Sequence, residues 1–145
     1  MKNLCIIPCG KKKIWDVFPG SGPVYAKDAY QGVLHKKCRE YARRNGYGWT
    51  ILSAKHGFLH PNDIVPENYD TGFHFPKEQI ISDDSLTRQW NEKGFYQIKT
   101  IILLTGKKHE TVIRRVIPNL HHYEWKTPLK GCRGIGEMLQ RLNHL

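Results

Sequence analysis

The sequence lacks the features that mark membrane, secreted and metal-binding proteins. No apolar run approaches the roughly 20 residues that a membrane-spanning helix needs. No secretory leader is visible and the four cysteines form no CxxC pair, so we expect reduced thiols and a cytoplasmic protein without a membrane partner. The eight histidines show neither the helical i, i+4 spacing with a glutamate nor accompanying cysteine pairs. We therefore expect no metal and no other cofactor.

Internal repeats and low-complexity tracts are also missing, and acidic residues are scarce. The 145 residues have the size of one domain, so we predict a single domain over residues 1–145. Lys and Arg number 23 against 13 for Asp and Glu, a formal net charge of +10. Such an excess attracts polyanions. We expect nucleic acid or a nucleotide as the partner, against the alternative of a basic surface with no dedicated partner; the sequence leaves the oligomeric state open.

Apolar patterns predict the fold class. Four apolar runs predict strands: Asn3–Pro8, Gly48–Ser53, Lys99–Thr105 and Leu120–Trp125. The first three have continuous apolar centres, which are typical of strands covered on both faces. Amphipathic spacing predicts helices over Gln31–Arg44, Asp83–Lys93, Lys108–Ile117 and Gly136–Asn143. The alternation predicts an α/β fold with three layers, a mainly parallel sheet of about four strands and helices on both faces. We expect the core strands Asn3–Ile7, Thr50–Ser53 and Thr100–Leu104 to be adjacent.

The predicted strands end in polar loops. These are "PCGKKK" (Pro8–Lys13), "SAKHG" (Ser53–Gly57) and "TGKKH" (Thr105–His109), while "GCRGIG" (Gly131–Gly136) precedes the last helix. Ligands of open α/β sheets sit beyond the carboxyl ends of the strands, glycines allow close backbone approach, and helix N-termini bind anions. The long stretch Ala54–Pro76 has the length of a functional loop. We predict one pocket whose ligand-binding residues are Cys9, Gly10, Lys12, Ser53, His56, Tyr69, Thr105, Gly134 and Gly136.

Structural roles compete with these functional ones. Cys9 is either a small buried filler or, beside lysines and a helix start, a favoured thiolate. Ser53 is also placed to cap the following turn, and Tyr69 to fasten the long loop. Lys55 is either a surface residue or, if desolvated, a nucleophile.

Several motifs resemble a known group of proteins. They are "PCGKKK", "AKDAYQG" (Ala26–Gly32), "WTILSAKHGFLHPND" (Trp49–Asp63), "NYD" (Asn68–Asp70) and "GIGEML" (Gly134–Leu139). In this order, and over nearly the whole chain, they resemble the YaaA-like group of small, mostly uncharacterised bacterial and phage proteins. That resemblance implies a link with peroxide stress and DNA binding, which agrees with the positive charge.

The first motif also resembles, more distantly, the PC-S-x-x-K-P-Y-S signature of archaeosine synthase, which modifies a deazaguanine base in tRNA. Cys9 and Lys13 fall on the Cys and Lys of that signature, whereas Gly10 replaces its Ser and "IWD" replaces its "PYS". The resemblance therefore implies a base or nucleotide pocket, while the departures leave the lysine-transfer chemistry open.

We predict four catalytic residues on this basis: Lys13, Tyr30, Lys55 and Asp70. A tyrosine can stack on a nucleobase or donate a phenolic proton, and a carboxylate can pair with the edge of a nucleobase or act as a general base. A lysine can neutralise a phosphate or serve as a nucleophile. The leading hypothesis is an enzyme acting on a nucleotide, a nucleobase or an N-glycosidic bond. The alternatives are a non-catalytic DNA- or RNA-binding module linked to stress or damage, and a small-nucleotide sensor or partner-binding protein. Basic residues of His35–Gly46 are expected to flank the pocket.

Overall fold

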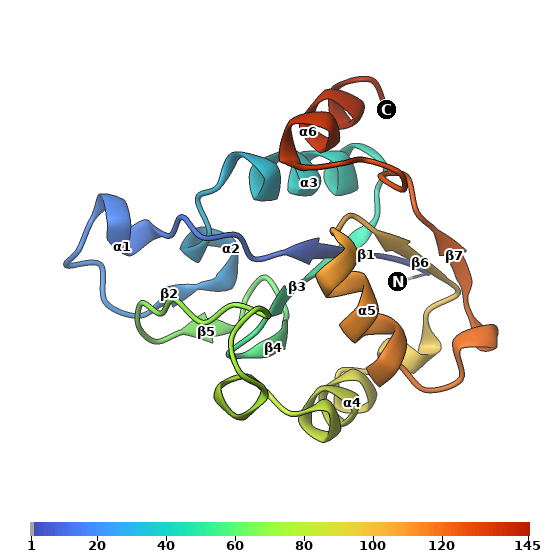
Figure 1. Ribbon diagram of the computed structural model, residues 1–145, viewed down its shortest axis with the longest axis horizontal. Coiled ribbons are helices and arrows are strands. Elements are labelled where there is room, and N and C mark those ends of the chain that lie inside the picture. Colours follow the sequence, from blue (N-terminus) through green and yellow to red (C-terminus); the bar gives the residue numbers. More distant parts are fainter. Residues whose placement is uncertain (1) are drawn as a thin grey trace.

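A five-stranded sheet forms the centre of the protein, for which a computed structural model describes residues 2–145 (Figure 1). Its strand order is β4-β3-β1-β6-β7, with bounds Gly57–Leu59, Gly48–Ser53, Asn3–Pro8, Thr100–Leu103 and Glu124–Lys126. β1 pairs in parallel with both β3 and β6, and β6 pairs in parallel with β7. The predicted adjacency of the three core strands is therefore confirmed.

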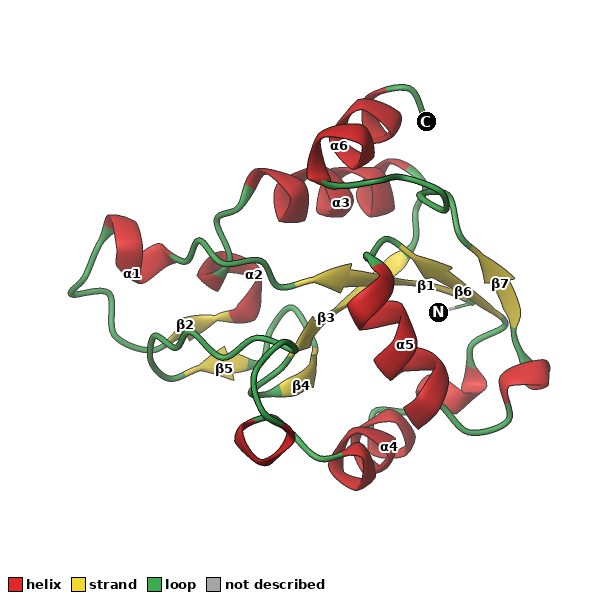
Figure 2. Cartoon of the chain, viewed as in Figure 1, coloured by secondary structure: helices red, strands yellow, loops and turns green. Residues whose placement is uncertain are grey.

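Helices cover both faces of the sheet (Figure 2). α3 (Val33–Arg44) and α6 (Ile135–Asn143) pack on one face, whereas α4 (Asp83–Glu92) and α5 (Lys107–Val116) pack on the other. Successive residues of a strand point to opposite faces, so Leu4 and Ile6 of β1 join the α4–α5 side while Cys5 and Ile7 join the α3–α6 side. Within residues 2–145, no helix has the length and apolar character needed to span a membrane.

The sheet differs from the prediction in strand number and direction. It has five strands, and β4 runs antiparallel to β3, so the sheet is mixed. β4 lies in the stretch predicted as a loop, because its three residues are too few to show a period. β7 begins at Glu124, since Leu120–His122 form a 3-10 turn (η3).

A small arm follows β1 and carries the chain from Lys13 to Tyr30. It contains α1 (Ile14–Val17), β2 (Val24–Tyr25) and α2 (Ala26–Ala29), and β2 pairs with β5 (Ile64–Val65) in a separate two-stranded sheet. A bridge between Lys13 and Tyr30 closes the arm. The arm contributes four buried residues that pack against Ile51 of β3 and Leu59 of β4: Trp15, Ala26, Ala29 and Tyr30. The arm is therefore held against the carboxyl end of the main sheet.

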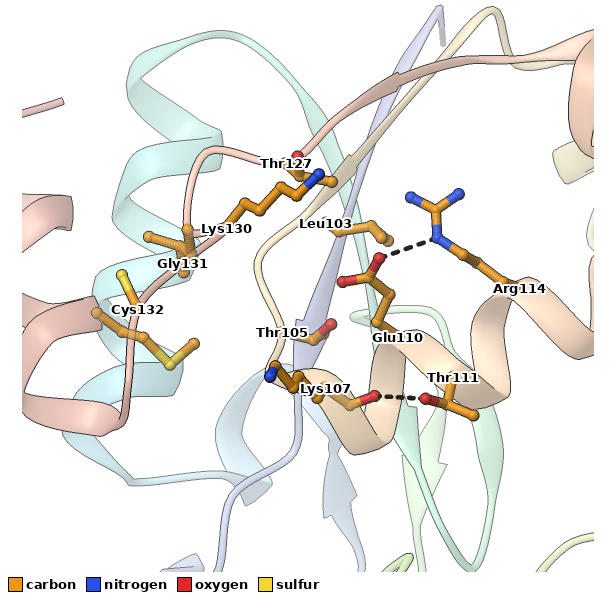
Figure 3. Close-up of a pocket in the computed structure, with 13 residues that line it drawn as sticks. Leu103, Thr105, Lys107, Glu110, Thr111, Arg114, Thr127, Lys130, Gly131 and Cys132 are labelled. Atoms are coloured by element: carbon orange, nitrogen blue, oxygen red, sulfur yellow. Dashed lines mark hydrogen bonds and ion pairs between the residues drawn. The ribbon is translucent and has the colours of Figure 1, made fainter.

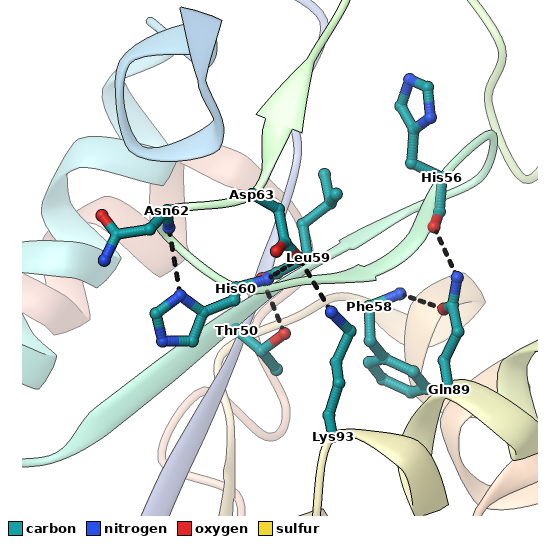
Figure 4. A network of polar contacts seen from close by, with 9 residues as sticks. All are labelled: Thr50, His56, Phe58, Leu59, His60, Asn62, Asp63, Gln89 and Lys93. Atoms are coloured by element: carbon teal, nitrogen blue, oxygen red, sulfur yellow. Dashed lines mark hydrogen bonds and ion pairs between the residues drawn. The ribbon is translucent and has the colours of Figure 1, made fainter.

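A polar network holds β4 and the turn before it against α4 (Figure 4). The Gln89 side chain accepts a hydrogen bond from the Phe58 N–H at 2.8 Å and donates one to the His56 carbonyl at 2.9 Å. Nearby, Lys93 and Asp63 form an ion pair at 2.8 Å. These contacts fix the β3–β4 turn, which carries two of the predicted site residues.

Candidate functional site

Three hydroxyl groups meet at the carboxyl end of β3. The Tyr69 hydroxyl is hydrogen-bonded to Ser53 Oγ at 2.7 Å and, through a short contact, to the Tyr30 hydroxyl. Ser53 Oγ also accepts the backbone N–H groups of Lys55 at 3.2 Å and His56 at 3.0 Å. Because its oxygen already accepts two hydrogen bonds, Ser53 donates its proton to Tyr69. We call Tyr30, Ser53 and Tyr69 the tyrosine cluster.

The tyrosine cluster is neutral at physiological pH. Burial raises the pKa of Tyr30, and the neighbouring Tyr69 raises it further. Burial likewise raises the pKa of Tyr69, in spite of the hydrogen bonds from Ser53 and Tyr30 that lower it. Ser53 and Tyr30 are fully buried, so their hydroxyls position Tyr69 beneath the surface. Ser53 thus caps the turn that follows β3, which is the structural role expected as the alternative to ligand binding.

Lys13 supplies a buried amine beside this cluster. Its side chain is only 4% exposed, its Nζ donates to the Lys11 carbonyl at 3.1 Å, and Nζ lies 4.5 Å from the centre of the Tyr69 ring. Burial lowers the pKa of Lys13, opposed by the charges of Cys9, Asp16 and Asp70. A lysine with a lowered pKa holds more of the neutral, nucleophilic amine at pH 7.

The structure corrects the idea that Lys55 is the desolvated nucleophile. Lys55 is exposed, and its Nζ lies 5.6 Å from the centre of the Tyr69 ring. The β3–β4 turn points its side chain toward solvent, whereas the bridge to Tyr30 draws Lys13 inward. The desolvated amine of this site is therefore Lys13.

Two hollows adjoin Lys13, and Lys11, Lys13 and Asp70 line both of them. One has a volume of about 330 Å³ and polar walls completed by Asp16, Asn68 and Tyr69. The other, which we call the apolar hollow, has a volume of about 380 Å³ and includes the aromatic rings of Phe73 and Phe75. Each is within the range of small-ligand pockets, about 300–1,000 Å³. We call the two hollows together the Lys13 cleft.

His109, which lines the apolar hollow, has an unpaired imidazole nitrogen. His109 Nε2 is buried and has no hydrogen-bond partner within residues 2–145. Its ring centre lies 4.9 Å from that of Phe73, and burial lowers the pKa of His109 to about 4. His109 is therefore a neutral group able to exchange a hydrogen bond with a ligand in this hollow.

Cys9 and Gly10 complete the apolar hollow from the end of β1. Burial raises the pKa of Cys9, and this outweighs the lowering by Lys13. The side chain is therefore a buried thiol, in agreement with the filler interpretation rather than with a thiolate. Gly10 has φ +76° and open space around it, so the backbone at the rim of the hollow can be approached closely.

The structure brings together most, but not all, of the predicted site residues. Cys9, Gly10, Lys13, Tyr69 and Asp70 line the Lys13 cleft. Behind it, Tyr30 and Ser53 lie under Tyr69, and the rings of His56 and Tyr69 meet edge to face at 5.0 Å. Lys13, Tyr30 and Lys55 thus all contact Tyr69, although neither Tyr30 nor Lys55 lines the cleft.

Four predicted residues lie elsewhere. Lys12 is exposed and lines neither hollow. Thr105 lines a separate pocket at the end of β6, and Gly134 and Gly136, at the start of α6, line neither part of the cleft. The prediction of one shared pocket is wrong for Thr105, because α5 begins between the pocket that contains Thr105 and the Lys13 cleft.

Sequence reasoning missed several residues of the cleft. Phe73 and Phe75 alternate in "FHF" within the stretch predicted to be functional, and this aromatic pair was the available signal. His109 stood at the end of "TGKKH", but its contact with the distant Phe73 ring could not be read from the sequence. Within residues 2–145, no group of three or more His, Cys, Asp or Glu side chains is arranged to hold a metal ion.

Comparisons with known proteins support a shared family and fold. The model of a family of unknown function, DUF6884, matches residues 4–144. The uncharacterized protein YfjM of Bacillus subtilis (strain 168) is 52% identical over 143 residues, which cover 99% of this chain and 94% of YfjM. The crystal structure of AF0587, a protein of unknown function, matches with a TM-score of 0.50 at 15% identity. That match covers 98% of this chain but 43% of the AF0587 chain, so it shows the fold alone.

Proposed function

The chain belongs to the DUF6884 family, whose function is unknown, and we propose from the Lys13 cleft that it is an enzyme acting on a nucleotide. Its target is the base or the N-glycosidic bond of a nucleoside, a nucleotide or a nucleic acid. The observation that carries the proposal is the buried amine of Lys13, placed between a polar and an aromatic hollow. A nucleoside has the same division, with a flat aromatic base joined to a polar sugar.

The apolar hollow suits a nucleobase. Phe73 and Phe75 offer ring faces or edges for contact with a base, and such contacts tolerate different bases. The unpaired Nε2 of His109 supplies a hydrogen-bonding group for a base edge. The motif likeness to the YaaA-like group, and to archaeosine synthase at Cys9 and Lys13, supports the same ligand class.

Lys13 is the group proposed to react. In N-glycosidic cleavage, the neutral amine forms a bond to the sugar C1′ while the C1′–N bond breaks and its electron pair leaves with the base. The attacking nitrogen loses a proton to Asp70, which lines the same cleft, and water protonates the departing base. The C1′–O4′ bond then breaks, O4′ takes the remaining amine proton, and an imine forms between Lys13 and C1′. Water hydrolyses this imine and frees Lys13, whereas borohydride reduces it to a stable adduct.

The experiment combines turnover with adduct trapping on a panel of nucleosides, nucleotides and oligonucleotides. Lys13→Met should abolish turnover and the borohydride-dependent mass increase. Lys12→Met, the same change at the exposed neighbour, should keep both within threefold of the wild type. Turnover that survives in Lys13→Met would contradict the assigned role, and turnover without a trapped adduct would move the reaction from the sugar to the base.

A second candidate function is nucleic-acid binding without catalysis. A hollow of about 760 Å³ along α3 is lined by three basic residues and one acidic residue, with Gly46 and two aromatic rings: Lys36, Arg39, Arg43, Glu40, Tyr47 and Trp49. The Arg39 guanidinium lies 5.0 Å from the Trp49 ring centre, so this surface offers both positive charge and an aromatic face. It shares no lining residue with the Lys13 cleft.

Salt dependence distinguishes the two candidates. Arg43→Gln, which removes one exposed charge from α3, should weaken binding to mixed-sequence DNA uniformly and reduce the salt slope by about one. Lys13→Met should leave that binding nearly intact. Equal losses in both variants would make the Lys13 cleft part of a general basic surface and favour the binding module. Capture of a nucleotide without turnover in any condition would favour a small-nucleotide sensor.

A further inference from the structure

A separate pocket lies at the carboxyl end of β6 (Figure 3). It has a volume of about 360 Å³ and lies between the first turns of α5 and the loop that joins β7 to α6. We call it the α5 pocket. Its lining includes Thr105, Lys107, Glu110, Arg114 and Lys130. It has no lining residue in common with the Lys13 cleft.

The α5 pocket contains a buried hydroxyl with no partner. Thr105 is 8% exposed, and its Oγ1 is buried without a hydrogen bond to any of residues 2–145. In Figure 3 the hydroxyl faces the interior of the pocket, toward the space between β6 and α5. Buried hydroxyls are nearly always paired, so an unpaired one that faces a pocket indicates a ligand atom.

The start of α5, where Gly106 and Lys107 line the same pocket, has free backbone donors. The helix has ten residues, and its N-cap, Gly106, provides no side-chain cap. The first intrahelical bond runs from the Glu110 N–H to the Gly106 carbonyl, so the N–H groups of residues 107–109 have no helical acceptor. Free N–H groups and the helix dipole together favour an anion at this position.

The charged side chains of the pocket also favour an anion. Glu110 is neutralised by Arg114, whose Nε lies 2.9 Å from the carboxylate. Neither Lys107 nor Lys130 forms a salt bridge within residues 2–145, so both charges are available to a ligand. Figure 3 shows Lys130 and Arg114 extending from opposite walls of the pocket.

We propose that the α5 pocket binds a phosphate group. Its donors are the Thr105 hydroxyl, the free N–H groups at the start of α5 and the Lys107 and Lys130 amines. A tetrahedral dianion accepts hydrogen bonds on several sides, which matches donors that converge from a strand end, a helix start and a loop.

The same helical turn also connects the pocket to the Lys13 cleft. Lys107 lines the α5 pocket, whereas Lys108 and His109, the next two residues, line the apolar hollow of the cleft. A ligand whose base occupies the apolar hollow can therefore place a phosphate across the start of α5. This step rests on the proposed function and identifies the substrate as a phosphate-bearing nucleotide or a nucleic-acid strand, not a free base or nucleoside.

Titration calorimetry with inorganic phosphate tests the pocket by itself. Thr105→Val, which keeps the shape of the side chain and removes the hydroxyl, should weaken phosphate binding about tenfold. Lys130→Met should have a similar effect, while Lys126→Met, at an exposed position outside the pocket, should stay within twofold. Thr105→Val should also raise the melting temperature of the free protein, since the unpaired hydroxyl is gone. Undiminished phosphate binding in Thr105→Val and Lys130→Met would overturn the proposal.

A competition experiment tests the link to the cleft. Inorganic phosphate should compete with a nucleoside monophosphate and should not affect binding of the matching nucleoside. Lys13→Met should leave phosphate binding unchanged, so a failure of the proposed enzymatic function and a failure of the phosphate site give different results. Phosphate binding that does not compete with the nucleotide would retain the site and overturn the assignment of the substrate.

Discussion

The tyrosine cluster and the α5 pocket lie at the same carboxyl edge of the sheet but treat buried hydroxyls in opposite ways. The hydroxyls of Tyr30, Ser53 and Tyr69 bond to one another, and no ligand is needed to satisfy them. The Thr105 hydroxyl has no partner within residues 2–145 and points toward the α5 pocket, which Thr105 lines (Figure 3). The first region is organised before any ligand arrives, as expected of reactive groups, whereas the second is completed by a ligand, as expected of a binding subsite.

The difference follows from what holds each region. The tyrosine cluster depends on the β3–β4 turn, which α4 clamps through Gln89, and on a loop that returns Tyr69 from far along the chain. The α5 pocket is formed where β6 runs into α5 through one short turn. A substitution that disrupts the contacts between Gln89 and the β3–β4 turn should therefore disturb the tyrosine cluster and leave the α5 pocket unchanged.

The largest expected effect comes from Gly57, at the start of β4. It has φ +79°, and an added Cβ would collide with the Gln89 side-chain amide and lie 2.7 Å from Ile81 Cδ1. Gly57→Ala should therefore lower the free energy of unfolding by about 3 kcal/mol or more, measured by urea denaturation. Phosphate binding at the α5 pocket should persist at temperatures where the variant is folded.

Gly46→Ala is the matched control for this change. Gly46 has φ +68° with open space around it, so its alanine variant carries only the left-handed backbone cost, about 1–2 kcal/mol. Equal losses in the two variants would show that the contact with Gln89 does not hold the turn.

The next effect concerns His35, which lies below the tyrosine cluster. Its ring is 1% exposed, its Nδ1 bonds to the Pro8 carbonyl at 3.0 Å, and its centre lies 5.5 Å from that of Tyr30. Burial lowers the pKa of His35 to about 4, below the unfolded value of 6.5. The unfolded chain therefore binds more protons between these pH values, and stability falls as the pH falls from 6.5 toward 4, by about 3 kcal/mol.

Urea denaturation across this pH range measures the effect. His35→Gln should be less stable than the wild type at pH 7 and should lose less stability on acidification. His144→Gln, at an exposed position near the C-terminus, should follow the wild-type pH dependence. If His35→Gln lost as much stability as the wild type between pH 6.5 and pH 4, His35 would not be the group responsible for that loss.

The smallest expected effect comes from the hydroxyl of Tyr69. Tyr69→Phe removes its bonds to Ser53 and Tyr30 and should lower the free energy of unfolding by about 1–2 kcal/mol. Urea denaturation at pH 7 measures this free energy.

Tyr25→Phe, at a half-exposed position of the arm, serves as the control and should leave the free energy of unfolding unchanged. Phosphate binding should be the same in both variants, since neither touches the α5 pocket. A weakened phosphate site in Tyr69→Phe would mean that the two regions are coupled and not separate.

The sequence by itself determined the main layers of this protein. The centres of β1, β3 and β6 are continuously apolar, so these segments had to be covered on both faces, and the amphipathic stretches between them supplied the cover. Both signals are local, because they depend on side chains only a few residues apart. The polar loops at the strand ends likewise placed the candidate site at the carboxyl edge.

Only the tertiary structure decided which residues share a site and which of them are buried. Lys13 and Lys55 both follow strands in polar loops, yet the bridge to Tyr30 buries the first and the clamped turn exposes the second. Tyr30 and Tyr69 are 39 residues apart and meet only because the arm and the long loop fold onto β3. Burial and hydrogen-bond partners depend on segments distant in the chain, and no local pattern of residues records them.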